Sequence, residues 1–394
     1  MSACAPGARP TPVSRTAAVP VANPDFDAWV ASFRTRAAQR GIAQPILSGA
    51  FQDAGYLPLV IERDRNQTEF TRNLEDYLAI AASDERIEKG QAGLRRERRT
   101  LDAIAAQYGV EPHVVTAVWG LESRYGERRG DIPVISALST LAYDGRRGAF
   151  FEQQLIAALK ILQEGDTVPA RMTGSWAGAM GHTQFIPTSY LAYAVDFTGD
   201  GRRDIWSEDP TDSLASTAAY LQRSGWRSGQ PWGLEARLPQ GFNMRATGRS
   251  GARSVASWSA LGVTDARGET LPDYGQTAIL APEGAVGPAF AVYHNFGVIL
   301  RYNNAEKYGL GVGYLSDRLI GRPPLVAGFP PDARGLTLED RKNIQTRLTA
   351  RGFDTQGSDG VIGPNTTDAI RAFQRSAGLP VDGQASAELL AQLQ

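Results

Sequence analysis

The chain has 394 residues, of which 42% are hydrophobic and 21% charged, the composition of an ordinary globular protein with room for about two or three domains. Its 41 lysines and arginines balance 42 aspartates and glutamates, so the net charge of -1 gives no reason to expect nucleic acid as a partner. The single cysteine excludes an internal disulfide, and three widely separated histidines argue against a histidine-based zinc site.

Residues 1–23 are rich in proline, alanine and threonine and are expected to form a flexible leader. Within it, Cys4 follows the small residues Ser2 and Ala3, as an acylated cysteine does at the end of a lipoprotein signal, so Cys4 is a candidate membrane tether. The apolar segment that precedes such a cysteine is missing, and an incidental cysteine in a flexible tail is the equal alternative. No stretch of the sequence approaches the length of a transmembrane helix.

The pattern of apolar residues predicts a chain that is mainly helical. Spacings of three and four residues over 26–33, and further periodicity over 70–80 and 94–108, are typical of helices with one buried face. Between about 238 and 291, glycine, proline and serine become frequent, and the short apolar runs 276–281 and 290–293 predict strands. Helix is expected again over 305–320. We therefore expect an α+β fold, mainly α, with a small β-rich insertion.

The C-terminal part is expected to be a separate module. Four prolines within residues 321–335 predict a linker, because proline is rigid and lacks a backbone donor. Residues 336–394 then contain three short helical patterns, separated by turns at Asp359-Gly360 and Asp382-Gly383. This predicts a compact three-helix module after a larger region that spans residues 24–320.

A glutamate in an apolar stripe is the first candidate for chemistry. The segment from Pro112 to Gly126 predicts a helix, because proline suits a first helical turn and glycine a helix end. Glu122 lies four residues after Val118 and three before Tyr125, on the apolar face. Burial is expected to raise its pKa, which suits a general acid near neutral pH. The alternative is a solvated glutamate that pairs with a nearby arginine; the candidates are Arg124, Arg128 and Arg129.

A glycine-spaced loop over residues 174–190 is the second candidate. Its glycines allow tight turns, and Ser175, Gln184 and Tyr190 offer neutral hydrogen-bonding groups that suit sugar hydroxyls and amides. It lacks the lysine and the hydroxyl of a phosphate-binding loop. A plain tight loop around a buried Trp176 is the alternative.

Together these two segments resemble the lytic murein transglycosylases of the membrane-bound type B family. Further motifs that match this family follow in the expected order: Tyr143-Asp-x-Arg-Arg147, Asp196-Phe-x-Gly-Asp-Gly201, Ala219-Tyr220-Leu-x-x-x-Gly-Trp226 and Asn295-Phe-x-x-Ile-x-Arg-Tyr-Asn303. The resemblance implies a lysozyme-like catalytic domain over residues 24–320. It also implies a lyase that cleaves peptidoglycan between N-acetylmuramic acid (MurNAc) and N-acetylglucosamine (GlcNAc) in cell-wall remodelling or turnover.

In the implied reaction, Glu122 protonates the bridging oxygen and then takes the proton from the muramoyl C6 hydroxyl, which closes a 1,6-anhydro ring without water as nucleophile. Because the substrate's acetamido group assists, one catalytic carboxylate suffices and no cofactor is required for the chemistry. By position in the matching motifs, the expected substrate-binding residues are Ser175, Gln184, Tyr220, Tyr302, Asn303, Arg146 and Arg147, with Tyr77 as a looser match.

The loop that begins at Asp196 resembles the start of an EF-hand, with oxygen ligands at alternating positions followed by glycine. A structural calcium ion is therefore a candidate. The expected ligands are Asp196, Thr198, Asp200 and the carbonyl of Arg202. The resemblance to the family, whose loop is lengthened, implies Asp212 as the closing carboxylate. Glu208 and Asp209 compete for the closing position, and an Asp/Gly-rich turn without metal is the alternative.

The residues over 336–394 resemble the three-helix peptidoglycan-binding domain, on matches such as Gly352-Phe353 and the run from Asp359 to Ile370. The resemblance implies peptidoglycan glycan strands as the partner, and we expect a monomer in the periplasm, with lipid anchoring as a further possibility. Two other functions stay open. One is a hydrolytic muramidase, for which Asp131, Asp144 and Asp196 are nominal second carboxylates. The other is a catalytically silent wall-binding scaffold.

Overall fold

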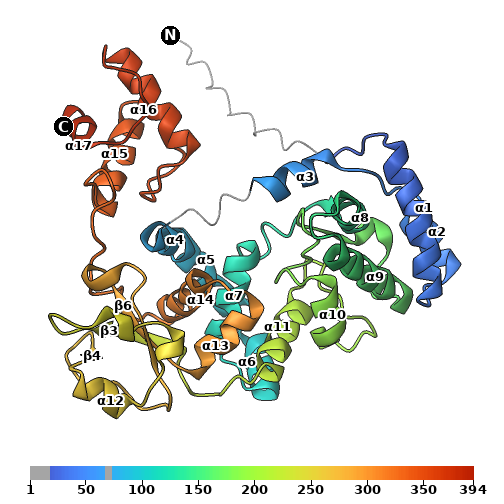
Figure 1. Cartoon of the computed structure of the whole chain (residues 1–394), viewed down its shortest axis with the longest axis horizontal. Coiled ribbons are helices and arrows are strands. Elements are labelled where there is room, and N and C mark those ends of the chain that lie inside the picture. The colour runs from blue at the N-terminus through green and yellow to red at the C-terminus, as the bar shows by residue number, and fades with distance from the viewer. Residues whose placement is uncertain (1–17, 67–72) are drawn as a thin grey trace, which may run out of the picture. The chain divides into compact units, whose positions relative to one another are not determined.

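The computed structural model describes residues 18–66 and 73–394, so Cys4 and most of the expected leader lie outside the described residues. The described chain forms two compact units (Figure 1). Unit 1 comprises residues 18–66 and 130–179, and unit 2 comprises residues 73–129 and 180–394. Each unit is described by itself.

Unit 1 is helical, with one short antiparallel pair of strands. Its first helix follows an asparagine cap, since the Asn23 side chain accepts the backbone N–H of Phe26 at 3.0 Å. The helix Val134–Asp144 is buried along most of its length, and it packs against the helices Gly148–Glu164 and Pro58–Arg65. The elements are α1 (Pro24–Gln39), α2 (Gln44–Ala50), α3 (Pro58–Arg65), β1 (Ile132–Pro133), α8 (Val134–Asp144), α9 (Gly148–Glu164) and β2 (Thr173–Gly174).

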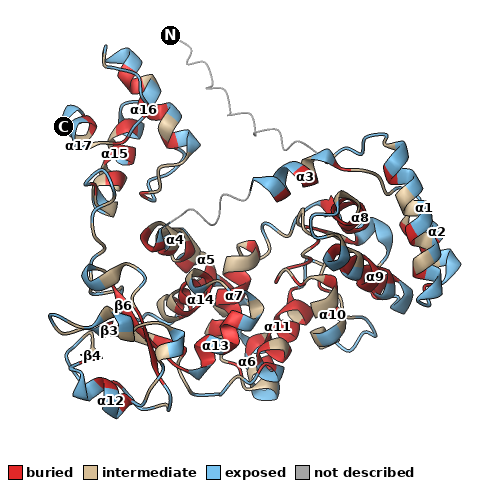
Figure 2. Cartoon of the chain, viewed as in Figure 1, coloured by how far each residue is buried: buried red, intermediate tan, exposed pale blue. Residues whose placement is uncertain are grey.

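Unit 2 is built around one helix, α7 (Pro112–Ser123), which carries Glu122 and packs against four other helices. Most residues of α7 are buried, and the helices around it each carry a buried face (Figure 2). The packing partners of α7 are α5 (Asp84–Arg96), α6 (Arg98–Tyr108), α11 (Thr211–Arg223) and α14 (Glu306–Leu319). The other helices of this part are α4 (Leu74–Ala81), α10 (Pro187–Tyr193) and α13 (His294–Tyr302).

The expected β-rich insertion is a four-stranded antiparallel sheet in unit 2, with strand order β4-β3-β6-β5. Strand β3 (Gly233–Arg237) pairs with β6 (Ala289–Val292), and Ala236 lies opposite Ala289. The outer strands are β4 (Thr264–Asp265) and β5 (Ala278–Leu280), and α12 (Val255–Ala260) adds the fully buried Trp258 to the local core. The expectation of an α+β fold that is mainly α is confirmed.

The C-terminal module has the three expected helices, α15 (Leu338–Ala350), α16 (Pro364–Ser376) and α17 (Ala387–Gln392). A capping box starts the first of them: Thr337 accepts the backbone N–H of Asp340, and Asp340 accepts that of Thr337. The small core is apolar and includes Ile344, Ile370 and Leu389.

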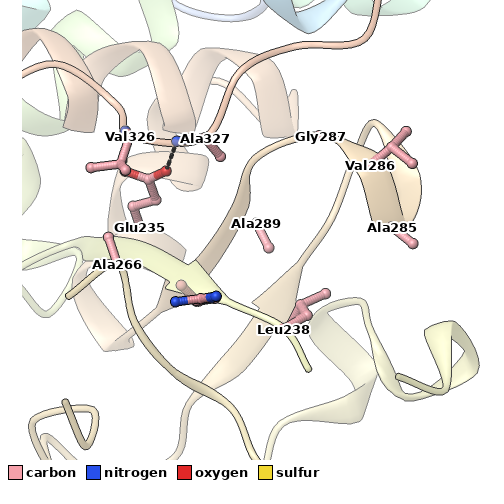
Figure 3. A pocket seen from close by; sticks show the side chains of 11 residues that line it. Glu235, Leu238, Ala266, Ala285, Val286, Gly287, Ala289, Val326 and Ala327 are labelled. Carbon is pink, nitrogen blue, oxygen red and sulfur yellow. Dashed lines mark hydrogen bonds between the residues drawn. The ribbon is translucent and has the colours of Figure 1, made fainter. Parts of the chain in front are cut away.

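The segment between α14 and α15 has no helix or strand, but it is attached to the sheet. The carboxylate of Glu235 on β3 accepts the backbone N–H groups of Val326 at 2.7 Å and Ala327 at 2.6 Å (Figure 3). A cavity of about 300 Å³ lies beside this contact, lined by small residues such as Ala285 and Ala289. None of the residues expected to bind substrate lines it.

Candidate functional site

The helix that carries Glu122 ends in a strained turn. Helix α7 stops at Ser123, and the next three residues adopt left-handed backbone, with φ of 51° at Arg124, 60° at Tyr125 and 92° at Gly126. This conformation costs about 1–2 kcal/mol for each residue other than glycine, so other contacts must hold the turn. The Tyr125 hydroxyl donates to the carbonyl of Arg86 at 2.7 Å. Tyr125 therefore lies beyond the helix, not within its apolar stripe as the sequence suggested.

Glu122 lies at the edge of a hydrophobic core and is half-buried. Val118, one turn earlier, is fully buried, and Leu121 packs against the same core. The buried Tyr308, near the start of α14, donates its hydroxyl to Oε1 of Glu122 at 2.6 Å. A hydrogen bond to a carboxylate is among the stronger kinds, so this contact fixes the orientation of the carboxyl group.

A row of tyrosines extends from Glu122. The rings of Tyr308 and Tyr302 are stacked at 6.5 Å, those of Tyr302 and Tyr220 lie 4.9 Å apart, and those of Tyr220 and Tyr193 lie 4.4 Å apart. Burial, together with the nearby Glu122 carboxylate, raises the pKa of Tyr302 and Tyr308 well above the ordinary value. These hydroxyls therefore stay protonated, and each donates to a protein oxygen: Tyr302 to the carbonyl of Thr183 and Tyr308 to Glu122.

Two further expected residues lie close to this row. Tyr77 on α4 is electrostatically coupled to Tyr308, and it packs so closely on α14 that a Cβ at Gly311 would lie 2.7 Å from its ring. Asn303 follows Tyr302 directly, is exposed, and accepts the backbone N–H of Ala305 at 3.1 Å. Its side chain thus shapes the entry to α14.

The expected loop is divided between the two units. In unit 2, Gln184 has a left-handed backbone with φ of 55°, and its side-chain N–H group donates to the carbonyls of Arg129 at 2.9 Å and Gly181 at 2.8 Å. The amide nitrogen of Gln184 is therefore engaged in holding the loop. The adjacent Thr183 carbonyl accepts the Tyr302 hydroxyl at 2.6 Å, which connects the loop to the tyrosine row.

His182 in this loop is bonded to the helix that carries Glu122. Its Nδ1 accepts the Nε1–H of Trp119 at 3.1 Å, and its Nε2 lies 2.8 Å from the carbonyl of Ser207. The Ser123 hydroxyl donates to the carbonyl of His182. Because Nδ1 is the acceptor, Nε2 carries the proton and the ring is neutral. Burial lowers the pKa of His182, which favours the same form.

Sequence reasoning missed Tyr308 and His182. Tyr308 lies on the buried face of an amphipathic helix, where an aromatic residue ordinarily indicates core packing. His182 was considered only as a metal ligand, and its glycine-spaced loop gave the only signal that could have drawn attention to it.

Three expected residues belong to unit 1. The Ser175 hydroxyl accepts the backbone N–H groups of Ala177 at 3.3 Å and Ala179 at 3.1 Å, so it closes its own turn. Arg146 and Arg147 both bind Asp64, whose side chain is 2% exposed, while their own side chains are 50% and 46% exposed. Two guanidinium groups on one buried carboxylate leave an excess positive charge at the surface.

The loop that begins at Asp196 is closed by hydrogen bonds to its own backbone. Asp196 accepts the N–H groups of Gly199 at 2.7 Å and Gly201 at 2.8 Å, and these bonds lower the pKa of Asp196 although burial acts to raise it. The buried Asp212 uses both oxygens to accept the N–H groups of three residues: Phe197, Thr198 and Asp204. Within the described ranges, no group of three or more His, Cys, Asp or Glu residues is arranged to hold a metal.

Comparisons with known proteins agree with the geometry. The transglycosylase SLT domain family matches residues 25–317, and a peptidoglycan binding domain family matches residues 337–393. Membrane-bound lytic murein transglycosylase B of Escherichia coli K12 is 33% identical over 217 residues, which are 53% of this chain and 56% of that protein. The chain thus spans little more than half the length of this relative.

Solved structures are similar over more of the chain. SltB3 from Pseudomonas aeruginosa, in complex with NAG-NAM-pentapeptide, has 46% identity and a TM-score of 0.76, covering 94% of this chain and 99% of that one. The same protein has been solved with NAG-anhNAM-pentapeptide. Slt35 from E. coli in complex with calcium has 28% identity and a TM-score of 0.63, covering 76% and 93%. No helix of the described chain has the length and apolar character needed to cross a membrane.

Proposed function

The chain belongs to the transglycosylase SLT domain family, and we propose that it is a lytic transglycosylase that cleaves the MurNAc–GlcNAc bond of peptidoglycan with Glu122 as acid and base. The observation that carries this proposal is the Glu122 carboxyl group, held by Tyr308 at the edge of a core and beside a row of tyrosines. The NAG-NAM-pentapeptide and NAG-anhNAM-pentapeptide complexes of SltB3 support the substrate and the product.

In the proposed reaction, protonated Glu122 gives its proton to the bridging oxygen as the bond from C1 of MurNAc to that oxygen breaks. The substrate's acetamido group stabilises C1 in this step. The C6 hydroxyl then attacks C1, and its proton passes to the Glu122 carboxylate. The C1–O6 bond closes the 1,6-anhydro ring, and Glu122 returns to its starting state without consuming water.

The tyrosine row is proposed to bind the glycan. Aromatic faces offer apolar contact to sugar rings. The hydroxyl oxygens of Tyr302 and Tyr220, whose protons go to protein carbonyls, can accept from sugar hydroxyls, and the exposed amide of Asn303 offers further hydrogen bonds. On our proposal, the rings that contact the glycan come from Tyr220, Tyr302 and Tyr77. The loop residues Gln184 and Ser175 assist in binding it. Arg146 and Arg147 are proposed to meet carboxylates of the substrate with their excess positive charge.

Mass spectrometry of the products released from purified sacculi tests the reaction. We expect muropeptides that end in 1,6-anhydroMurNAc, lighter by one water than reducing ends. Glu122→Gln should abolish their release and leave binding to sacculi and the melting temperature near wild type. The matched control is Glu127→Gln, because Glu127 follows closely in sequence but is exposed and paired with Lys89. Normal activity of Glu122→Gln would overturn the mechanism.

The hydrolytic alternative requires a second carboxylate that positions water. Of the nominal candidates, Asp144 pairs with Arg65 at 2.8 Å and Asp196 accepts N–H groups of its own loop. Reducing-end products in the same experiment would favour this alternative. Retained binding to sacculi with no products at all would favour a silent scaffold.

Calcium at the Asp196 loop is a separate proposal. In the structure, Asp212 and Asp196 accept backbone N–H groups of the loop, which orients both carboxylates. Each carboxylate keeps further lone pairs for an ion, and any role of calcium here would be structural. A rise in melting temperature with added calcium, lost in Asp212→Asn, would support the proposal; no rise would refute it.

The C-terminal module is proposed to tether the enzyme to the cell wall. Tethering raises the local concentration of substrate without adding a catalytic contact. Removal of residues 336–394 should therefore weaken binding to sacculi more than cleavage of short soluble glycans. An equal loss on both would indicate that the module completes the active site. On this proposal the protein works in the periplasm as a monomer, and Cys4 is a candidate for lipid attachment.

A further inference from the structure

A large cavity lies in unit 2, where α4, α5 and α14 meet the linker and the C-terminal module. Its volume is about 790 Å³, which is the size of a site for a small molecule or a short peptide rather than a single ion. The linker forms part of its wall, and Leu325 and Phe329 in that linker also pack against the core of the catalytic region.

The cavity carries cations without acidic partners. Arg86 on α5 lines it and has a buried Nε atom with no hydrogen-bond partner. Among residues 18–66 and 73–394, no carboxylate pairs with Arg86, with Arg318 on α14 or with Lys342 on α15, although all three line the cavity. A partly buried guanidinium without a counter-ion is unfavourable, and burial lowers the pKa of Arg86.

The acidic residues of the cavity are mostly engaged elsewhere. Glu75 is bound by Arg341 at 2.6 Å, and Glu85 is shared by Arg124 at 2.7 Å and Lys89 at 2.9 Å. Two other carboxylates in the lining, Asp84 and Asp359, have no ion pair in the described chain. The lining therefore presents unpaired groups of both charges, with the positive ones in excess.

Apolar surface completes the lining. Leu78, Ile80, Tyr314 and Phe329 lie around the charged groups. A ligand that combines carboxylates with aliphatic groups, as a short acidic peptide does, meets both the unpaired cations and this apolar surface. The substrate of the proposed function bears such a peptide, since the ligand of SltB3 is NAG-NAM-pentapeptide.

We propose that this cavity binds the stem peptide of peptidoglycan through its free carboxylates, with Arg86, Arg318 and Lys342 as the binding cations. The inference rests on the proposed function for the identity of the ligand. The enzyme then recognises two peptide-bearing sugars of peptidoglycan at the same time, one at the glycan site and one through its stem peptide at the cavity. It therefore favours glycan strands that still carry stem peptides.

Calorimetry with the full-length protein tests the binding. The probe is a synthetic pentapeptide stem without sugar, compared with the same peptide whose carboxylates are converted to amides. Arg86→Met, and separately the double variant Arg318→Gln/Lys342→Gln, should each weaken binding of the free peptide about tenfold, as expected for loss of charge-assisted hydrogen bonds. The control Arg98→Gln removes an arginine that is 79% exposed on α6 and should bind as wild type.

Equal binding of the amidated peptide, or unchanged binding by both cation variants, would overturn the proposal. Equally tight competition by inorganic phosphate would also overturn it, because the cavity would then be a general anion site. The double variant alters two residues that are only half-buried, so it keeps the test valid if Arg86→Met does not fold.

Cleavage assays separate this proposal from the proposed function. The double variant Arg318→Gln/Lys342→Gln should release anhydro products from peptide-free glycan at the wild-type rate and from peptide-bearing sacculi more slowly. If the wild-type protein releases no anhydro products from either substrate, the proposed function is refuted. Calorimetry then decides the peptide binding by itself. Equal rates of the double variant and wild type on sacculi would refute the role of the cavity.

Discussion

His182 provides a quantitative test of how the helix that bears Glu122 is held. His182→Phe keeps a ring of similar size but removes both ring nitrogens, so the Nε1–H of Trp119, a residue that is 1% exposed, loses its acceptor. A buried donor without a partner costs about 1–3 kcal/mol. The carbonyl of Ser207 keeps a donor, because Arg129 also binds it at 2.6 Å. We therefore expect a loss of about 2 kcal/mol in the free energy of unfolding.

Thermal unfolding measures this loss. For a domain of this size, about 2 kcal/mol corresponds to a fall in melting temperature of roughly 4–8 °C. A double-mutant cycle with Trp119→Phe assigns the loss to the hydrogen bond, because removing both partners should cost at least about 1 kcal/mol less than the sum of the single changes. Additive losses would refute the claim that the Trp119–His182 bond holds the loop to α7.

The same bond makes a prediction about pH. Burial lowers the pKa of His182 from 6.5 in the folded protein, so below this pH the unfolded chain binds the proton more readily than the folded one. The contribution of His182 to stability is therefore complete above pH 6.5 and is lost as the pH falls toward the lowered value. Wild type should lose more stability than His182→Phe on acidification, and parallel curves of melting temperature would contradict this.

Three further predictions concern other parts of unit 2. Tyr308→Phe removes the donor to Glu122 and should slow glycan cleavage by about 10- to 100-fold with little change in KM, because a hydrogen bond to a charged group is worth about 1.5–3 kcal/mol. An unchanged kcat would contradict this expectation. Burial raises the pKa of Asp317 from 3.8 to about 6, so its contribution to wild-type stability should be lost as the pH rises through this range, and Asp317→Asn should flatten the curve of melting temperature against pH. Arg341→Leu leaves Glu75 buried without its partner and should destabilise the protein by about 3–5 kcal/mol, whereas Arg351→Leu on the same helix should not; equal melting temperatures of the two variants would refute this.

Local patterns predicted most of the elements. The amphipathic spacing over 26–33 and the Asp-Gly turns of the C-terminal module are decided by neighbouring residues, and both occur in the structure as helices and turns. The break between α5 and α6 at Glu97 was not predicted, because no proline or glycine marks it. The apolar runs 276–281 and 290–293 predicted β5 and β6 closely. Strands β3 and β4 were not predicted, since short strands gain their stability from partners that are distant in sequence.

The end of α7 shows why local rules stop short of the site. Gly126 predicted a helix end at that position, but the helix ends at Ser123 and two residues with side chains take the left-handed conformation. The cause is tertiary: the Ser123 hydroxyl donates to the carbonyl of His182, and a Cβ at Gly126 would lie 2.6 Å from the His182 ring. A loop 59 residues away thus decides where the helix stops.

The partner of Glu122 depends on the same kind of distant contact, and its chemical nature matters for the reaction. Two of the three arginines that the sequence placed near Glu122 bind other carboxylates: Arg124 pairs with Glu85 and Arg129 with Glu208. A fixed cation would favour the carboxylate so strongly that proton donation would be impeded. A tyrosine hydroxyl can donate to the carboxylate and, after rotation, accept from the carboxylic acid. Tyr308 therefore allows Glu122 to alternate between the two protonation states that a single acid and base requires, and this is why we expect Tyr308→Phe to affect kcat rather than binding.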